Sequence, residues 1–242
     1  MALENYDWER LTPEVYRCRL PFLDVTVGLV IGVTGVLLVD CGTTLAEAAA
    51  VADDVAELTG REVTHLVMTH HHFDHVLGSG EFTAAEHYAA PAVAAALGTG
   101  TDAVRAYALQ YGADPDEIDN AINALRVPDH VGMHARIDLG NCVALVEHPG
   151  PGHTDHDLVV VVPPASPDEP VVVFCGDLIE ESADPVIDEG SHLTAWPSTL
   201  DAVLGLGGPD AIYVPGHGAV VDAGFVRAQR DWLADRGLAG KA

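Results

Sequence analysis

Histidine and aspartate residues occur in four short blocks of this chain, and their side chains could hold metal ions. The blocks read His70-His71-His72-Phe73-Asp74-His75, then Gly152-His153-Thr154, then Gly176-Asp177 and finally Pro215-Gly216-His217-Gly218. Imidazole nitrogens and carboxylate oxygens are good ligands for zinc and for similar divalent ions. Besides His71, the blocks offer five imidazoles and two carboxylates, enough to hold two ions and leave room for a shared water.

The spacing within the first block divides its ligands between two ions. In a loop after a strand, His70 and His72 are expected to turn toward one ion, whereas Asp74 and His75 turn toward a second. His71 lies between two neighbours that face the first ion, so its side chain is expected to point away from the metals. The short spacing brings the ions within the roughly 3.5–4 Å that a two-metal hydrolytic site requires.

The three later blocks complete the ligands of the two ions. His153 supplies a third nitrogen to the first ion, and His217 joins the ligands of the second ion. Asp177 is a lone carboxylate at the end of an apolar run, so we expect it to bridge both ions. The predicted metal ligands are therefore His70, His72, Asp74, His75, His153, Asp177 and His217.

Apolar runs that read as strands precede these blocks. Residues 25–31 and 36–39 predict a β-hairpin, and residues 63–69 predict the strand that ends in the first block. Thr44 and Glu47 have the capping-box spacing of a helix start, and Gly60 suits the end of that helix. Further strands are predicted at residues 143–146, 158–162, 171–175 and 211–214.

The segment between the first and second blocks reads as helical. An apolar stripe at residues 104, 107, 108 and 111 is followed by the start of another helix at Asp114-Pro115. Residues 91–127 are interpreted as a helical insertion that either closes over the site as a lid or packs on the outside of the domain. With helices also expected at residues 198–206 and 222–236, the pattern predicts a layered α/β fold in a single domain over residues 1–242.

The composition limits the classes of protein to which the chain can belong. With 242 residues, 48% of them hydrophobic, it can bury one substantial core. A net charge of −26, with Lys241 as the single lysine, argues against nucleic acid and against an acidic membrane surface as partners. The four cysteines include no C-x-x-C pair, which argues against a zinc knuckle and against a disulfide scaffold.

The location of the protein is predicted from its N-terminal segment and its apolar runs. The first ten residues are acidic and aromatic, unlike a secretory leader, and the longest apolar runs have the length of strands. We therefore expect a cytoplasmic enzyme that acts on a small-molecule substrate, either as a monomer or as a homo-oligomer.

The four blocks resemble the ligand motifs of the metallo-β-lactamase-fold hydrolase superfamily. The H-x-H-x-D-H signature of this family is matched by His70, His72, Asp74 and His75. Its later His, bridging Asp and final His are matched by His153, Asp177 and His217. The resemblance extends over about residues 25–221 and includes Asp40 at the end of a strand. It implies a four-layer αβ/βα sandwich with the two metal ions at one edge of the paired sheets.

The same resemblance implies a hydrolase in which a hydroxide that bridges the two ions attacks a carbonyl carbon. A carboxylic ester, a lactone or a thioester is the expected bond, and Asp74 is the catalytic residue expected to assist proton movement. The ions are expected to be zinc, with iron and manganese as alternatives. Asp40, Thr69 and Thr154 are candidates for holding the imidazole rings in place. His192 is a candidate substrate contact.

Asp177 favours the Asp-bridged branch of the family, to which glyoxalase II and the lactonases belong, because zinc β-lactamases typically carry Cys or Ser at that position. Few positive charges follow His217, which disfavours a glutathione thioester. Tyr107, Tyr111 and Tyr213 are candidates for the tyrosine that lactonases often present to the substrate carbonyl.

Two functions of other classes remain as alternatives. Persulfide dioxygenases use a similar ligand set to hold a single iron that activates oxygen, but Glu180-Glu181 stands here where they carry a basic segment. A metal-binding structural protein without activity would be favoured by the loss of a ligand, and the ligand set of this chain is complete.

Overall fold

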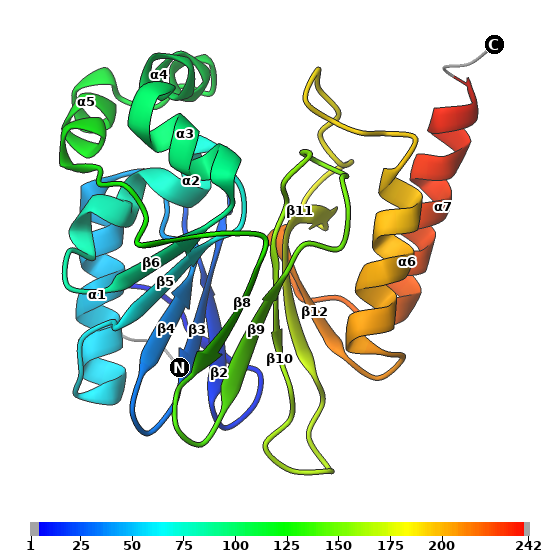
Figure 1. Ribbon diagram of the computed structural model, residues 1–242, viewed down its shortest axis with the longest axis horizontal. Coiled ribbons are helices and arrows are strands. Elements are labelled where there is room, and N and C mark those ends of the chain that lie inside the picture. The colour runs from blue at the N-terminus through cyan, green and yellow to red at the C-terminus, as the bar shows by residue number, and fades with distance from the viewer. Residues whose placement is uncertain (1–4, 240–242) are drawn as a thin grey trace.

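Two β-sheets pack face to face in the computed structural model, and helices cover the outer face of each sheet (Figure 1). The structure describes residues 5–239. The start of the N-terminal segment discussed above, residues 1–4, and Lys241 lie outside the described residues. The four layers confirm the αβ/βα sandwich predicted from the sequence, as a single domain.

The first sheet has seven strands in the order of the chain. They are β1 (Glu9–Arg10), β2 (Val15–Arg19), β3 (Thr26–Ile31), β4 (Val36–Val39), β5 (His65–Met68), β6 (Glu86–Ala89) and β7 (His130–Val131). Strands β1 to β4 pair antiparallel, and strands β4 to β7 pair parallel. Because β4 and β5 are parallel neighbours, Asp40 and the first histidine block follow them at the same edge of the sheet.

The second sheet has five strands in the order β12-β11-β10-β9-β8. They are β8 (His134–Asp138), β9 (Val143–Glu147), β10 (Val159–Val162), β11 (Val172–Glu180) and β12 (Ile212–His217). Strand β11 is longer than the sequence predicted, because it continues through Asp177 to Glu180 with register shifts against β12 on both sides of Gly176. Asp177 therefore lies within an irregular strand rather than after its end.

Seven α-helices and one short 3₁₀ helix are found within residues 5–239. They are α1 (Leu45–Thr59), α2 (Phe73–Val76), η1 (Leu77–Glu81), α3 (Pro91–Thr99), α4 (Thr101–Gln110), α5 (Pro115–Ala124), α6 (Trp196–Gly207) and α7 (Ala223–Ala239). Helix α1 starts with the predicted capping box, in which the Glu47 backbone donates to Thr44 Oγ1 at 3.1 Å, and it ends at Gly60 with φ of 69°. No helix in this part of the chain is both long and apolar enough to cross a membrane.

Buried apolar side chains form three clusters that hold the layers together. One fills the space between the sheets and beneath α1, and another lies between the second sheet and helices α6 and α7. The third joins α2 to α4 and α5. Gly28 of β3 permits a close approach of the two sheets, because a Cβ there would lie 2.3 Å from the Phe174 ring of β11.

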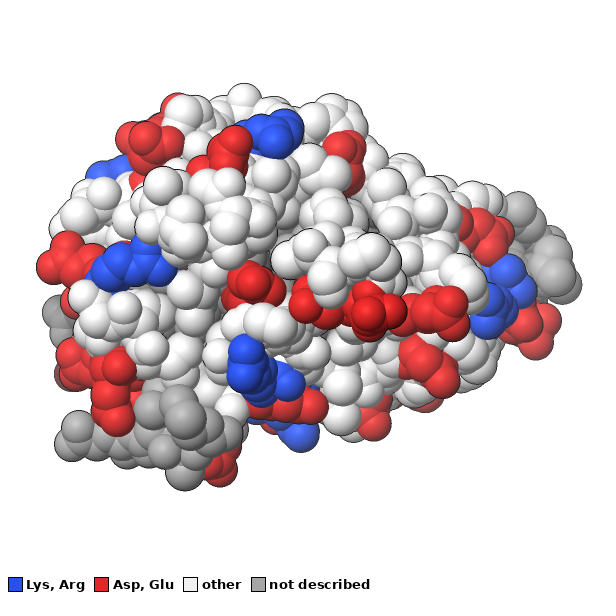
Figure 2. Space-filling view, turned by 90° about the horizontal axis from the view of Figure 1, so that it is seen from below, with Lys and Arg blue, Asp and Glu red and all other residues white. Residues whose placement is uncertain are grey.

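Acidic side chains outnumber basic ones, in line with the net charge of −26. On the face shown in Figure 2, red acidic side chains are spread among a few blue basic ones.

Candidate metal centre

The first histidine block lies where strand β5 turns into helix α2. His70 lies in the connecting turn, and His72 occupies the position before the helix. Helix α2 has only four residues and carries both Asp74 and His75. His70 and His75 are completely buried, while His72 and Asp74 are 8% and 5% exposed.

The remaining candidate ligands come from the second half of the chain. His153 lies in the loop between β9 and β10, Asp177 lies within β11, and His217 is the last residue of β12. Strands β11 and β12 are parallel neighbours, which brings Asp177 close to His217. Gly216 is required at this approach, because a Cβ there would lie 1.9 Å from Asp177 Oδ1.

Four side chains form a first group that could hold an ion: His70, His72, His153 and Asp177. His153 Nε2 lies 3.0 Å from His72 Nδ1. Asp177 Oδ2 lies 3.5 Å from Nε2 of His70 and 3.5 Å from Nε2 of His153. Three imidazoles and one carboxylate oxygen therefore converge on one point.

Three further side chains form a second group: Asp74, His75 and His217. His217 Nε2 lies 3.4 Å from His75 Nε2 and 3.4 Å from Asp74 Oδ2. In each group, all the candidate ligand atoms lie within 4.8 Å of one another. The structure thus brings together all seven residues that the sequence singled out, in the division between two ions that their spacing suggested.

Asp177 lies between the two groups and presents a different oxygen to each. Its Oδ2 faces the first group, as described above, while its Oδ1 lies 3.1 Å from His75 Nε2 and 3.5 Å from His217 Nε2. A carboxylate in this position can bind one ion with each oxygen. This is the arrangement of a bridging ligand in a two-metal site.

Two polar atoms inside the cluster are buried without a hydrogen-bond partner, His70 Nε2 and Asp177 Oδ1. An unsatisfied buried polar group costs about 1–3 kcal/mol, so a missing partner is expected at this point. A divalent ion would supply it, and the set of imidazole and carboxylate donors fits zinc as well as iron or manganese. The residues therefore fit a dinuclear metal site.

The imidazoles of the second group are held from behind. His75 Nδ1 donates to Asp40 Oδ2 at 2.8 Å, and His217 Nδ1 donates to the Leu23 carbonyl oxygen at 2.8 Å, so both rings turn Nε2 toward the metal groups. Asp40 and Leu23 have φ of 61° and 57°, a left-handed conformation that is uncommon for residues other than glycine. The two residues that fix these imidazole rings therefore carry backbone strain.

Thr69 orients His70 in the first group. Its Oγ1 donates to Asp40 Oδ2 at 2.9 Å, which leaves the oxygen to accept from His70 Nδ1 at 3.1 Å. Asp40 and Thr69 thus hold imidazole rings, in line with the sequence analysis. Thr154 does not have this role, because its hydroxyl donates to Asp157 at 2.7 Å instead.

Burial and charge shift the pKa values of two histidines in the first group and two in the second group in opposite directions. Burial lowers the pKa of His70 and His72 well below the ordinary value for histidine. Burial also acts to lower the pKa of His75 and His217, but the nearby carboxylates, above all Asp177, outweigh it. The pKa of His75 is consequently raised well above its ordinary value, and that of His217 is raised to about 9.

A cavity of about 160 Å³ opens onto both groups. Tyr107 of α4 and Tyr111, the residue after the end of this helix, form part of its wall, and the same helix packs Val104 and Ala108 into the cluster beneath it. Residues of the predicted apolar stripe therefore both pack into the domain and border the cavity at the metal groups. The prediction that Tyr213 could contact the substrate is wrong, because this residue is completely buried and its hydroxyl donates to the Gly208 carbonyl.

A larger cavity of about 550 Å³ adjoins the first and shares His72, Phe73 and Tyr107 with it. His192, the predicted substrate contact, lines this larger cavity. His71 also lines it and belongs to neither metal group, as its position between two ligands suggested.

Three further residues lie near the centre, of which Arg17 and Leu23 were missed by the sequence analysis. Glu180, 7% exposed, lines the metal cavity, and its carboxylate accepts from the Ser182 hydroxyl at 2.6 Å. Arg17 donates to the Gly218 carbonyl at 2.6 Å and so ties β2 to the turn after His217. Leu23 acts through its carbonyl oxygen, so its residue type carries no signal of its role.

Comparisons with known proteins agree with this fold. The DIM-1 metallo-beta-lactamase structure is similar with a TM-score of 0.70 and 16% identity, over 96% of this chain and 98% of that one. A metallo-beta-lactamase from Pontibacter korlensis gives a TM-score of 0.69 and 17% identity, over 94% of this chain and 98% of that one. At these identities the similarity shows the fold alone, and no curated protein matches the sequence.

The family itself is shown by sequence. The profile of the metallo-beta-lactamase superfamily matches residues 20–217, a range that begins before β3 and ends at His217. All seven candidate metal ligands fall within it. The chain therefore belongs to the metallo-beta-lactamase superfamily.

Proposed function

We propose that the chain is an Asp-bridged dinuclear metallohydrolase that cleaves an ester, a lactone or a thioester in a small molecule. The observation that carries this proposal is the position of Asp177, whose two oxygens face two separate groups of candidate ligands. A site for a single ion would need only one of these groups.

In this proposal, His70, His72 and His153 would hold one ion, Asp74, His75 and His217 would hold the other, and Asp177 would contribute an oxygen to each. Two ions of this kind, which we propose to be zinc, supply an activated water and polarise the substrate carbonyl. Asp74 is the proposed catalytic residue, because its buried carboxylate borders the cavity and can accept and return a proton there.

The identity of the bridging residue also supports a choice of branch. An aspartate at position 177 favours the branch that contains glyoxalase II and the lactonases over the zinc β-lactamases, which typically carry Cys or Ser there. The hydroxyls of Tyr107 and Tyr111 lie 3.2 Å apart on the wall of the metal cavity. Either one is placed to contact a substrate carbonyl at that wall.

The test is elemental analysis of protein purified without added metal or chelator, followed by assays on esters, lactones and thioesters. About two ions per chain, with hydrolysis that a chelator abolishes and zinc restores, is the expected result. One iron per chain, with oxygen uptake in the presence of a persulfide, would instead support the dioxygenase alternative. Two ions with no hydrolysis of any of the three bond classes would overturn the proposed chemistry.

A further inference from the structure

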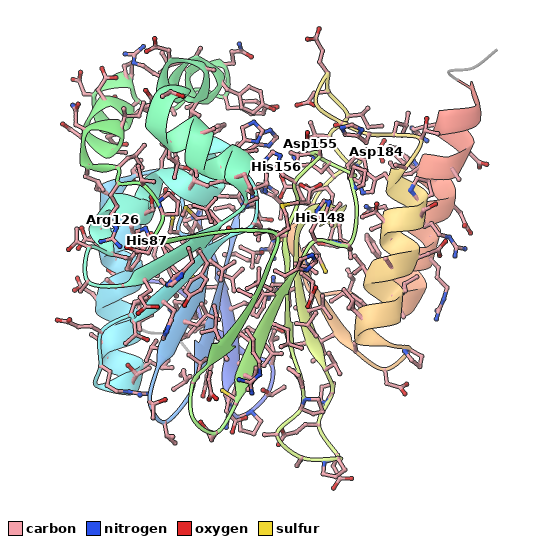
Figure 3. All side chains as sticks on the ribbon, viewed as in Figure 1. His87, Arg126, His148, Asp155, His156 and Asp184 are labelled. Atoms are coloured by element: carbon pink, nitrogen blue, oxygen red, sulfur yellow. The ribbon has the colours of Figure 1, made fainter. Side chains whose placement is uncertain are left out.

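The larger of the two cavities, about 550 Å³, has the position of a substrate subsite. Helices α3 and α4 form one side of it, and residues 154–156 and 188–192 form the other. Figure 3 shows Asp155 and His156 between the α2–α4 helices and the loop that follows β11. Because this cavity shares His72 and Tyr107 with the metal cavity, a molecule that reacts at the metals can extend into it.

The helical side of this cavity is apolar. Phe73 of α2 lines it next to the ligands of the first block, and Val104 and Tyr107 continue the wall along α4. Phe73 and Val104 also belong to the buried cluster that joins α2 to α4 and α5, so packed side chains support this wall. Three more lining positions carry at most a methyl group and leave the space open: Ala96, Gly100 and Ala103.

Hydrogen bonds fix the opposite side of the cavity. The Ser191 hydroxyl donates to the His153 carbonyl oxygen at 3.1 Å, and the backbone N–H of His192 donates to the Gly152 carbonyl oxygen at 2.8 Å. Ser191 Oγ also accepts from the Asp188 backbone N–H at 3.1 Å. The loop after β11 is therefore tied to the segment that carries a candidate metal ligand, and the cavity is preformed, as ligand sites usually are.

The charges around the cavity limit the kind of group that can enter it. Asp188 and Glu189 line the loop side, and none of the described residues that line the cavity is Lys or Arg. A carboxylate or phosphate on a ligand would therefore meet like charge without a cationic partner. Because both acidic side chains are exposed to water, they do not oppose an uncharged ligand. An uncharged apolar group would leave water for the apolar helical side, which is favourable.

We propose that this cavity binds an uncharged alkyl chain on the part of the substrate that does not react, and that Ala103 of α4 keeps the space for this chain open. The assignment rests on the proposed function, because that function places the reacting bond in the neighbouring metal cavity. It names a substrate class for that function, in which esters, lactones or thioesters with an alkyl chain are preferred over their short-chain counterparts.

Binding of uncharged probes to the metal-loaded protein tests the assignment without requiring turnover. The probes are straight-chain primary amides from butanamide to octanamide, titrated by calorimetry near neutral pH. The amide group is the same in every probe, so differences in affinity report on the chain. Each methylene that leaves water is expected to tighten binding by about threefold to fourfold until the cavity is filled.

A charged probe tests the selectivity of the same cavity. The monoamide of suberic acid has the chain length of octanamide but ends in a carboxylate. It is expected to bind at least about tenfold more weakly than octanamide, because its charge would leave water beside Asp188 and Glu189.

Two variants of α4 place the same charge inside and outside the cavity. Ala103→Asp adds a carboxylate to the cavity wall, in the first turn of α4, where an acidic residue is favourable for the helix. Octanamide binding should weaken about tenfold or more, while butanamide binding and metal content stay as they were. Ala106→Asp is the matched control, because Ala106 is exposed on the same helix but lines neither cavity, and it should bind octanamide as the wild type does.

Turnover gives a second measurement on the same variants. In the wild type, kcat/KM for p-nitrophenyl octanoate should exceed kcat/KM for p-nitrophenyl acetate. This preference should fall about tenfold in Ala103→Asp, with little change in acetate hydrolysis, and should be unchanged in Ala106→Asp.

The outcomes distinguish this inference from the proposed function. Equal binding of butanamide and octanamide, equal binding of octanamide and the suberic acid monoamide, or equal loss in Ala103→Asp and Ala106→Asp would each overturn the alkyl subsite. If esters or lactones are hydrolysed without preference for chain length and no amide binds, the subsite fails and the hydrolase stands. If the amides bind as expected but none of the three bond classes is cleaved, the hydrolase assignment fails and the subsite stands.

Discussion

The two groups of candidate ligands share Asp177 but place their histidines in opposite environments. In the first group, His70 and His72 are surrounded mainly by other imidazoles, and burial lowers the pKa of both rings. In the second group, His75 and His217 face carboxylates that raise the pKa of both rings in spite of burial. His70 and His72 are thus neutral nitrogen donors, whereas His75 and His217 hold protons when no metal is bound.

This difference shows that the groups around a histidine, rather than its residue type, decide whether its pKa is raised or lowered. His75 and His217 are both fixed from behind by an oxygen acceptor, Asp40 Oδ2 in one case and the Leu23 carbonyl in the other. Such contacts orient the ring and strengthen its basicity. The second group therefore combines tight orientation with a requirement to release protons as the ion binds.

The largest effect is expected from Asp177→Ala, which removes the side chain that faces both groups. Occupancy of both ions should fall, and hydrolysis should drop by more than about a hundredfold, because loss of a ligand exceeds the usual cost of losing a supporting contact. Metal content by elemental analysis and ester or lactone turnover are the measurements. Asp184→Asn, an exposed carboxylate outside both cavities, should keep both ions. Turnover at the wild-type rate in Asp177→Ala would refute the bridging role.

The pair His153→Ala and His217→Ala tests whether the two groups are separate. Each change removes one imidazole from one group, so each variant should retain about one ion per chain, in the group left intact. Native mass spectrometry of the zinc-loaded variants gives the count directly. If either change releases both ions, the two groups form one cooperative site and the comparison drawn above does not hold.

The sequence alone predicted those parts of the candidate site whose role depends on the type of side chain. The seven ligands stood out because imidazole and carboxylate groups followed apolar runs, and Asp40 stood out because it ended one. Leu23 could not be found in this way, since it acts through a backbone carbonyl that every residue has. Glu180 lies at the site because β11 continues irregularly beyond Gly176. The alternation of side chains along a regular strand does not predict such a continuation.

Long-range contacts set the other limit of the sequence analysis. Helical spacing put Tyr107 and Tyr111 on one face, but which structure that face would meet depended on how α4 docks on α2. In the same way, the sequence predicted that His71 turns away from the metals but not which residue it contacts, because its partner His156 lies 85 positions later in the chain. Tyr213 looked equally eligible as a tyrosine near a ligand, and only its burial under α6 and α7 removes it.

A smaller effect, stronger in the second group than in the first, is expected from Asp40→Asn. The amide nitrogen cannot accept from His75 Nδ1, whereas the remaining oxygen still accepts from the Thr69 backbone, a contact of 2.8 Å. Affinity for the second ion should fall by about 10–100-fold, with a smaller change at the first. Zinc titration against a competing chelator measures both affinities. An equal loss at the two groups would mean that Asp40 supports the loop as a whole rather than His75.

The mildest prediction concerns pH, and its sign follows from the direction of the pKa shifts. An ion binds a neutral imidazole, and in the metal-free protein His217 holds a proton up to about pH 9. Binding to the second group must displace that proton as well as the one that the raised pKa of His75 retains, so its affinity should fall by at least about tenfold for each unit that the pH drops below 9. His70 and His72 already lack protons near neutral pH, because burial lowers the pKa of each, and require no such release.

The one-ion variants allow this pH dependence to be measured for each group separately. His153→Ala keeps the second group intact, and its zinc affinity should rise steadily between pH 6.5 and 9. His217→Ala keeps the first group intact, and its affinity should rise less over the same range, because the pKa values of His70 and His72 are already low. Calorimetry in buffers of different ionisation enthalpy would count the protons released, with more expected from His153→Ala than from His217→Ala. Equal proton release from both variants would show that the carboxylates around His75 and His217 do not set the protonation of the second group. The two groups would then differ only in the arrangement of their side chains.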